Sequence, residues 1–332
     1  MSDVTILMTV YNGMPYLPQA VESICAQTHA DWRFVVVNDG STDGTRDYLS
    51  TLRDDRFLIL HRENAGTAAA ANHGLEFCNT RYLARMDADD ISLPTRLAEQ
   101  VAYLDAHPEV GLVGAQMAPL GSAGIGASLR LPTDHDTIMH ALLSGRHGMA
   151  HSCIMLRTEL LKQLGGYWSY RLNDAWDMML RMGEVARLAN LDRVLHHYRV
   201  HDRSLTGSRM RRMRQSIALA CELARRRQAG LPTITLDEFQ ARWDARPWWR
   251  RVAESIDLYA RCQYRVAQAE LYGGRPVRGS ARLAWAAFCA PQLTIERLAR
   301  ITSRLRGPTA PRPNEAAGVT HESACCRMGV TR

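Results

Sequence analysis

Apolar runs and amphipathic segments alternate along the first hundred residues. Four short apolar runs predict strands, at residues 4–10, 34–37, 57–60 and 82–86. The segments that follow them predict helices, at residues 18–27, 43–52, 67–77 and 94–104. Connections of this length join parallel strands through right-handed crossovers. The pattern therefore predicts an α/β, Rossmann-like fold with a mostly parallel sheet flanked by helices, whose ligands bind beyond the carboxyl ends of the strands.

The pattern changes twice further along the chain. Residues 110–203 are mixed, with strands expected at 110–114 and 152–157 and helices at 158–164 and 177–182. Beyond residue 207 the chain becomes helical and arginine-rich, and beyond 308 it is rich in proline, glycine and alanine. We therefore predict a globular domain over residues 1–206, a basic helical extension over 207–307, and a disordered tail over 308–332.

Charge supports this division. The chain has 332 residues, of which 46% are hydrophobic and 23% charged, which excludes a wholly disordered protein. Its net charge of +7 is uneven: residues 1–206 carry 18 basic and 24 acidic residues, whereas residues 207–332 carry 23 and 10. We expect the first part to hold cations and the second to meet anions.

Membrane-spanning and secreted classes are not favoured. The uncharged stretch 110–129 contains five glycines, which suit strands and turns better than a membrane helix. The eight cysteines are scattered without a C-x-x-C pair, and no basic-then-apolar leader opens the chain. We therefore expect a cytoplasmic protein with reduced thiols.

Polar motifs follow the first two predicted strands. Tyr11 and Asn12 could stack on and hydrogen-bond a planar base, although a simple turn explains them equally well. The string N-D-G-S-T-D-G-T at 38–45 places Asp39 beside glycines, where its carboxylate could accept a base N–H or a ribose hydroxyl. The alternative is a turn in which Thr42 or Asp43 caps the next helix. Neither the G-x-G-x-x-G fingerprint nor a P-loop is present.

An acidic string, Asp87-Ala88-Asp89-Asp90, follows the fourth predicted strand. Three acids so close together repel one another unless a cation compensates them. Mg²⁺ and Mn²⁺ bind oxygen ligands, and commonly use few protein carboxylates together with substrate phosphates. Asp89 is the expected direct ligand; the alternative is a helix-capping turn built on Asp90 or Ser92.

Taken in order, these motifs resemble those of family 2 glycosyltransferases. The resemblance extends over residues 3–206 and is carried by several further strings: E-N-A-G at 63–66, N-H-G at 72–74, H-S-C-I-M-L-R at 151–157, L-G-G-Y at 164–167, W-D-M-M-L-R at 176–181 and Y-R-V-H at 198–201. It implies a GT-A fold and an inverting transfer of a sugar from a nucleotide diphosphate donor, most often a UDP-sugar. The acceptor would be a saccharide or a lipid-linked saccharide in bacterial cell-envelope or exopolysaccharide synthesis.

The resemblance also implies roles for single residues. Thr9, Tyr11 and Asp39 would hold the nucleoside, with Asp87 near the ribose or diphosphate. Asp89 would bind Mn²⁺ or Mg²⁺, which stabilises the charge of a diphosphate leaving group. His201 matches a late histidine that approaches the metal or diphosphate; the alternative is an ordinary surface histidine.

Two positions depart from the family pattern. Alignment of Trp176 to Arg181 without a gap puts Ala175 where the usual catalytic aspartate stands, which leaves Asp174 or Asp177 as the base that inversion requires. We favour Asp174, because Asp177 could instead cap a helix at 178–181. Ala71 replaces a common arginine, for which Arg62 or Arg85 could substitute. One alternative is therefore a catalytically impaired protein that only binds nucleotide sugars.

The basic C-terminal region lies outside the resemblance. Its arginines cluster at 211–214, 225–227 and 250–251, next to Trp248 and Trp249, and an amphipathic stripe is expected at 294–305. Three interpretations are open: a packed helical subdomain with a solvated arginine face, a contact with an anionic membrane, or nucleic-acid binding. No nucleic-acid module accompanies the charge, so that interpretation is the least favoured. Membrane contact would make the enzyme peripheral on the inner face of the plasma membrane, and a recruitment protein led by this region is a non-enzymatic alternative.

Overall fold

The computed structural model describes residues 3–122, 124–128, 130–168, 174–200 and 207–291. Its strands are β1 (Val4–Val10), β2 (Trp32–Asp39), β3 (Phe57–Arg62), β4 (Tyr82–Asp87), β5 (Ile91–Ser92), β6 (Val110–Gly121), β7 (Gly124–Ile125), β8 (Met155–Arg157) and β9 (Arg187–Arg199). Its α-helices are α1 (Leu17–Cys25), α2 (Thr45–Thr51), α3 (Thr67–Leu75), α4 (Arg96–Ala106), α5 (His135–Leu143), α6 (Thr158–Gln163), α7 (Asp174–Val185), α8 (Gly207–Gln228), α9 (Leu236–Asp244), α10 (Trp248–Tyr272) and α11 (Pro276–Cys289).

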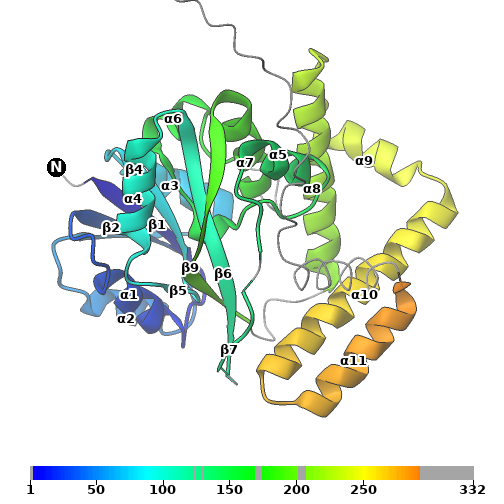
Figure 1. Cartoon of the computed structure of the whole chain (residues 1–332), viewed down its shortest axis with the longest axis horizontal. Helices are drawn as coiled ribbons and strands as arrows, with labels where there is room; N and C mark the ends of the chain where they lie inside the picture. The colour runs from blue at the N-terminus through cyan, green and yellow to red at the C-terminus, as the bar shows by residue number, and fades with distance from the viewer. Residues whose placement is uncertain (1–2, 123, 129, 169–173, 201–206, 292–332) are drawn as a thin grey trace, which may run out of the picture. The chain divides into compact units, whose positions relative to one another are not determined.

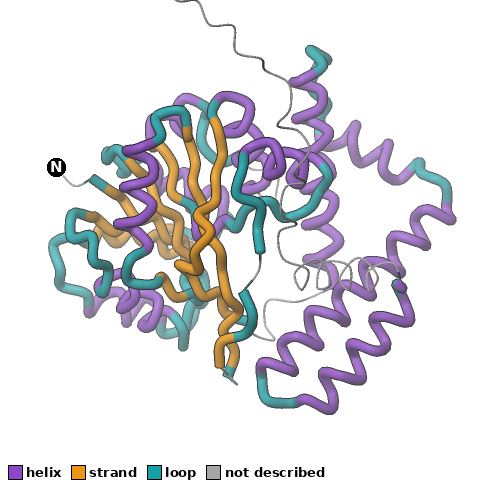
Figure 2. The backbone as a smooth tube through the Cα atoms, viewed as in Figure 1, coloured by secondary structure: helices purple, strands orange, loops and turns teal. Residues whose placement is uncertain are grey.

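The strands form one mixed sheet in the order β3-β2-β1-β4-β8-β6-β9-β5, with β7 paired to β6 (Figure 1). The pairs among β1, β2, β3 and β4 are parallel, as is β6 with β9, whereas β8 runs antiparallel to both its neighbours. Figure 2 shows helices on both sides of the strands. The predicted α/β architecture, mostly parallel and flanked by helices, is confirmed.

Both faces of the sheet are buried, which explains why its first strands read as continuous apolar runs. Leu7 and Val35 point into one core, which they share with α3, α5 and α7. Ile6 and Phe34, one position earlier in each strand, point into a second core with α1 and α4. Side chains alternate between the two faces of a strand, so a strand covered on both sides needs apolar residues at every position.

The second half of the sheet differs from the prediction. Strand β9 was not predicted, because polar residues interrupt its apolar periodicity. Two of them are fully enclosed: Asn190 donates to the carbonyls of Pro132 and Gly148, at 2.6 and 2.8 Å, and His196 is bonded to Asp90. Partners far along the chain thus bond the amide nitrogen of Asn190 and one ring nitrogen of His196, polar groups that would otherwise oppose burial.

The helices after residue 207 pack on the first domain. Ala220, Cys221 and Ala224 of α8 belong to the same core as α5 and α7. Residues Met1–Cys289 make up one compact unit. The predicted boundary after residue 206 adjoins residues outside the described ranges, and the one after 307 lies wholly outside them, so both stay predictions. Among the described helices, none is both long and apolar enough to cross a membrane.

Candidate active site

The polar motifs lie at adjacent strand ends. β1 is the middle strand of three parallel neighbours, and its register pairs Val10 with Asn38 of β2 and Thr9 with Asp87 of β4. The carboxyl ends of parallel strands share one edge of the sheet. The fold therefore brings together segments that are almost 80 residues apart in the sequence.

The loops after β1 and β2 are bonded to each other. Asn12 has a positive φ of 54°, and its side-chain oxygen accepts from the backbone N–H of Thr42 at 2.8 Å. Its own N–H donates to the hydroxyl of Ser41 at 2.9 Å. Asn12 thus holds the second loop in place, whereas Tyr11 beside it leaves 51% of its surface exposed. Of the two, Tyr11 has the ring available to stack on a base.

Asp39 is buried and braces the loop after β3. Its carboxylate accepts from the N–H groups of Ala65 and Gly66, at 3.1 and 2.9 Å, and lies 3.4 Å from Nε of Arg62. These bonds hold the E-N-A-G string against the end of β2. Asp39 is expected to contact the nucleoside, but its carboxylate already accepts the hydrogen bonds that hold this loop in place.

Asp43 has the structural role considered as the alternative to ligand binding: it closes the turn that leads into α2. Its carboxylate accepts from the N–H of Thr45, the first residue of α2, at 3.0 Å and from that of Met14 at 3.1 Å. Partial burial raises the pKa of Asp43, but hydrogen bonds from Thr45 and Met14 outweigh it and leave the pKa below its usual value.

An open hollow of about 450 Å³ adjoins this loop pair, at the carboxyl ends of β2 and β3. Its lining is polar and carries two arginines: Gly40, Ser41, Arg46, His61, Arg62, Glu63 and Asn64. The position next to Asp39 suits a polar ligand that bears hydroxyl or phosphate groups.

Asp90 is turned into the protein, away from any ligand. One carboxylate oxygen lies 2.9 Å from Nε2 of His196, and the other accepts from the N–H of Arg199 at 2.8 Å. Burial, followed by repulsion from Asp89, raises the pKa of Asp90 to about 7. The helix-cap alternative for Asp90 is wrong, because α4 begins only at Arg96, after Thr95.

Asp87 and Asp89 are the acids of the string that remain toward the strand ends. The side chain of Asp87 is 45% exposed, and its carboxylate lies 3.7 Å from the guanidinium of Arg85. Partial desolvation, followed by the nearby charges of Asp90 and Asp89, raises the pKa of Asp87 above its usual value despite that arginine.

Arg85 is a fully buried cation beneath this site. Its guanidinium donates to the carbonyl of Leu7 at 2.9 Å and lies 3.5 Å from the hydroxyl of Thr9. Its Nε has no hydrogen-bond partner among the described residues. Arg62, the other expected substitute for an arginine at position 71, is occupied by the carbonyl of Ala69 at 2.7 Å.

Arg199 ties the end of β9 to the acidic turn. Besides its backbone contact with Asp90, its Nε donates to the carbonyl of Asp89 at 2.8 Å, and its guanidinium lies over the ring of Tyr16. Val200, the next residue, donates from its N–H to Leu120 at 3.0 Å. The Y-R-V-H string therefore reaches the acidic turn, although His201 itself lies outside the described residues.

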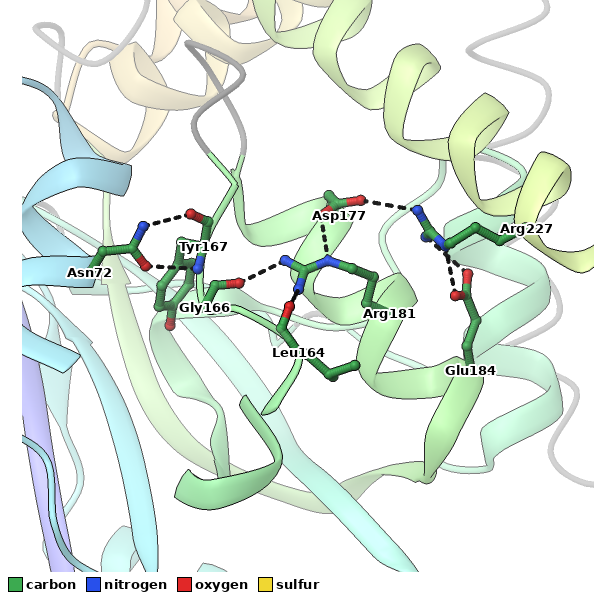
Figure 3. Close-up of polar contacts among 8 residues, drawn as sticks. All are labelled: Asn72, Leu164, Gly166, Tyr167, Asp177, Arg181, Glu184 and Arg227. Atoms are coloured by element: carbon green, nitrogen blue, oxygen red, sulfur yellow. Dashed lines mark hydrogen bonds and ion pairs between the residues drawn. The ribbon is translucent and has the colours of Figure 1, made fainter. Parts of the chain in front are cut away.

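The two candidate bases lie on α7. Asp174 is its first residue, and its side chain lies outside the described set. Asp177 is 4% exposed and accepts from Nε of Arg181 at 2.6 Å, while Arg227 of α8 lies 3.7 Å away (Figure 3). α7 begins at Asp174, so Asp177 does not cap it. A buried, ion-paired carboxylate is poorly placed to take a proton from an acceptor.

The ion pair of Asp177 anchors the loop that leads to Asp174. Arg181 donates to the carbonyls of Leu164 and Gly166, at 2.6 and 2.7 Å. Next to Gly166, the backbone of Tyr167 exchanges two hydrogen bonds with the side chain of Asn72, at 2.7 and 2.8 Å (Figure 3). α3, the loop and α7 thus form one bonded series.

Sequence reasoning missed His196, Arg199 and Asn72 as parts of the site's support. Asn72 and Arg199 lie within strings that the family resemblance had already marked, and that was the available signal. His196 carries no such signal, because its partner Asp90 is 106 positions away.

The carboxylate oxygens of Asp87 and Asp89 are ligands of the kind that suits Mg²⁺ or Mn²⁺, which bind with few protein ligands when phosphates supply the others. The described residues contain no group of three or more ligand side chains that could by itself hold a metal.

Comparison with known proteins finds relatives among glycosyltransferases. A model of glycosyl transferase family 2 matches residues 5–165. The putative glycosyltransferase EpsE of Bacillus subtilis is 32% identical over 204 residues, which cover 59% of this chain and 72% of EpsE. The amylovoran biosynthesis glycosyltransferase AmsE of Erwinia amylovora is 30% identical over 197 residues, which cover 58% and 74%.

Solved structures share the fold at low sequence identity. S. aureus TarS 1-349 in complex with UDP-GlcNAc superposes with a TM-score of 0.53 at 16% identity, over 84% of this chain and 88% of that one. The mannosyltransferase PcManGT of Pyrobaculum calidifontis, in complex with GDP-Man and Mn²⁺, gives a TM-score of 0.52 at 21% identity, over 91% and 81%.

Proposed function

Because the chain belongs to glycosyl transferase family 2, we propose that this enzyme moves a sugar from a nucleoside diphosphate donor, favoured to be a UDP-sugar, to a saccharide or lipid-linked acceptor. The process served is the synthesis of a bacterial envelope or exported polysaccharide. AmsE, named for amylovoran biosynthesis, supports that part of the proposal. TarS and PcManGT, with UDP-GlcNAc and GDP-Man, support a nucleotide-sugar donor.

One observation carries the proposal: Thr9 and Asp87 face each other in register at the strand ends, with Asp89 close by and Asp90 withdrawn. In this arrangement Tyr11 stacks on the base, Thr9 and Asp39 contact the nucleoside, and Asp87 adjoins the ribose or diphosphate. Asp89, together with His201, would hold a Mn²⁺ or Mg²⁺ ion that stabilises the charge developing on the leaving diphosphate.

Asp174 is the proposed base. It takes the proton from the acceptor hydroxyl while the oxygen of that hydroxyl forms the new bond to the anomeric carbon. The bond from that carbon to the diphosphate breaks on the opposite side, so the configuration inverts and the nucleoside diphosphate leaves. Asp177 keeps α7 and its preceding loop in position through Arg181.

The test is UDP binding with and without Mn²⁺, measured by titration calorimetry, followed by a screen of UDP- and GDP-sugars for turnover. We expect Mn²⁺ to strengthen binding, and Asp89→Asn to weaken binding in its presence at least about tenfold, equivalent to about 1.4 kcal/mol. Asp47→Asn, at an exposed acid of α2, is the control. Unchanged affinity in Asp89→Asn would remove Asp89 from the metal role, and a lack of binding to every nucleotide would reject the proposed donor class.

A further inference from the structure

An exposed apolar stripe runs along α10. Its members recur at spacings of four, four and three residues, which places them on one side of a helix. They are Trp248, Val252, Ile256 and Tyr259, each 47–70% exposed, with Trp249 beside them at 54%. Large apolar side chains gathered in this way are unusual on a monomer and mark an interaction surface.

α11 carries a matching stripe. Val277, Trp285 and Phe288 are 82%, 50% and 78% exposed, and the rings of Trp285 and Phe288 stack with centroids 5.7 Å apart. Nε1 of Trp285 lies 3.3 Å from the hydroxyl of Tyr259, so it joins this stripe to that of α10. We call these eight residues of the two stripes the aromatic face.

The uncompensated charge around the aromatic face is positive. Residues 248–289 contain seven arginines and three acids. Each acid is already paired with an arginine: Glu254 with Arg246 at 2.7 Å, Asp257 with Arg214 at 2.6 Å, and Glu270 with Arg282 at 3.0 Å. The other exposed arginines, which form no ion pair within the described ranges, are Arg250, Arg251, Arg275 and Arg278.

The helices α10 and α11 form a hairpin, and the turn between them is fixed to the catalytic unit. Tyr272 packs against Gly121 and Gly126 of the β6–β7 hairpin so closely that a Cβ at either glycine would collide with it. The hydroxyl of Ser122 also donates to the carbonyl of Tyr272 at 3.4 Å. The aromatic face is therefore held on a helix pair that is anchored to the same sheet as the site.

We propose that the aromatic face binds the surface of an anionic phospholipid membrane. Trp and Tyr rings suit the boundary between headgroups and acyl chains, because one end of each ring is apolar and the other polar. Arginines around them meet anionic headgroups while their stems lie along apolar surface. Charge complementarity selects this occupant over an apolar partner protein, which would leave the arginines without counter-charges.

The test is flotation of the full chain with vesicles of phosphatidylcholine alone or mixed with phosphatidylglycerol. We expect flotation only with the mixed vesicles, weakening as salt rises. The triple variant Ile256→Ser, Trp285→Ser, Phe288→Ser should lower the partition coefficient at least about tenfold. Arg250→Gln, Arg251→Gln and Arg278→Gln together should lower it about a hundredfold, at about fivefold for each arginine.

Matched controls alter exposed residues of the same types away from the hairpin: Phe77→Ser with Val185→Ser, and Arg33→Gln with Arg53→Gln. They should float like the unmodified chain, and all variants should keep the same melting temperature. A chain that floats with neither vesicle, or a triple variant that floats fully, overturns the proposal. A dimer in sedimentation that the triple variant abolishes, without flotation, assigns the face to a second copy instead. Because no donor or turnover is involved, the outcome is independent of the proposed function.

Discussion

At the residue scale, Arg85 is the least expected feature of the site. It is fully buried, whereas Asp87 above it is half exposed and Ala71 leaves no charge on α3. Positions 85 and 71 share Tyr167 as a neighbour. The guanidinium of Arg85 lies over the ring of Tyr167, and the backbone of Tyr167 is bonded to Asn72, which is next to Ala71. The charge absent at position 71 is thus present on β4.

We predict that Arg85→Gln weakens UDP binding about tenfold, because the leaving diphosphate loses the buried cation that lies 3.7 Å from Asp87. Arg96→Gln is the matched control: Arg96 is equally buried but bonds to the carbonyls of Arg85 and Ile154. Both changes should lower the melting temperature, and calorimetry should find weaker UDP binding only for Arg85→Gln. Equal affinities for the two folded variants would assign Arg85 a purely structural role.

The two aspartates of α7 should respond differently to the same substitution. Asp174→Asn is expected to lower the transfer rate by about 10²–10⁴-fold with unchanged UDP affinity and stability, as for removal of a general base. Asp177→Asn breaks a buried ion pair with Arg181 and should cost about 3–5 kcal/mol of unfolding free energy. Rate assays and urea denaturation separate them. A stable but inactive Asp177→Asn would make Asp177 the base.

At the element scale, the close approach of α3 to the sheet sets the position of the loop that Asp39 braces. Gly74 allows α3 to come this close, because a Cβ at that position would lie 2.9 Å from Cγ2 of Val37 and would collide with Leu7. Because both neighbours are buried in the core, neither has room to move.

Gly74→Ala is therefore expected to reduce the unfolding free energy by about 1–3 kcal/mol through overpacking. Gly44→Ala provides the comparison, because its φ is −68° and its Cβ would come no closer than 3.8 Å to another residue. That change should be neutral or stabilise the protein by at most about 1 kcal/mol. Urea denaturation measures both, and equal stability of the two variants would contradict the packing argument.

At the scale of the whole molecule, the acidic first part of the sequence and residues 207–289 of the basic second part belong to one compact unit. α8 begins directly after the predicted boundary, yet it contributes to the main core and also buries Leu219 and Leu223. Several acids of the first part lie at strand ends, and the α10–α11 hairpin of the second carries exposed arginines that form no ion pair within the described ranges.

A chain that ends at residue 206 is predicted to lose several kcal/mol of stability, at about 1.5–3 kcal/mol for each large apolar side chain no longer buried. Its melting temperature should fall by more than about 5 °C relative to a chain that ends at residue 291. Differential scanning calorimetry of the two truncated proteins decides this. Equal melting temperatures would mean that residues 1–206 are an independent domain.

The sequence by itself determined the first four strands and the helices between them. The spacing of apolar residues along a strand or helix follows from which of its faces are buried, so each element has its own local pattern. It also placed the polar motifs at strand ends, since parallel topology follows from the order of elements.

Only the tertiary structure decided the tasks of several of those residues. Asp90 read as a member of an acidic string and Asp177 as a candidate base, but each is withdrawn into the protein by a partner, His196 or Arg181. β9 escaped prediction because distant partners bond its buried polar side chains: two carbonyls accept from Asn190, and Asp90 is bonded to His196. The aromatic face likewise needed the pairing of α10 with α11. Local sequence reports the properties of neighbours along the chain, whereas burial and charge compensation depend on partners that only the folded chain brings together.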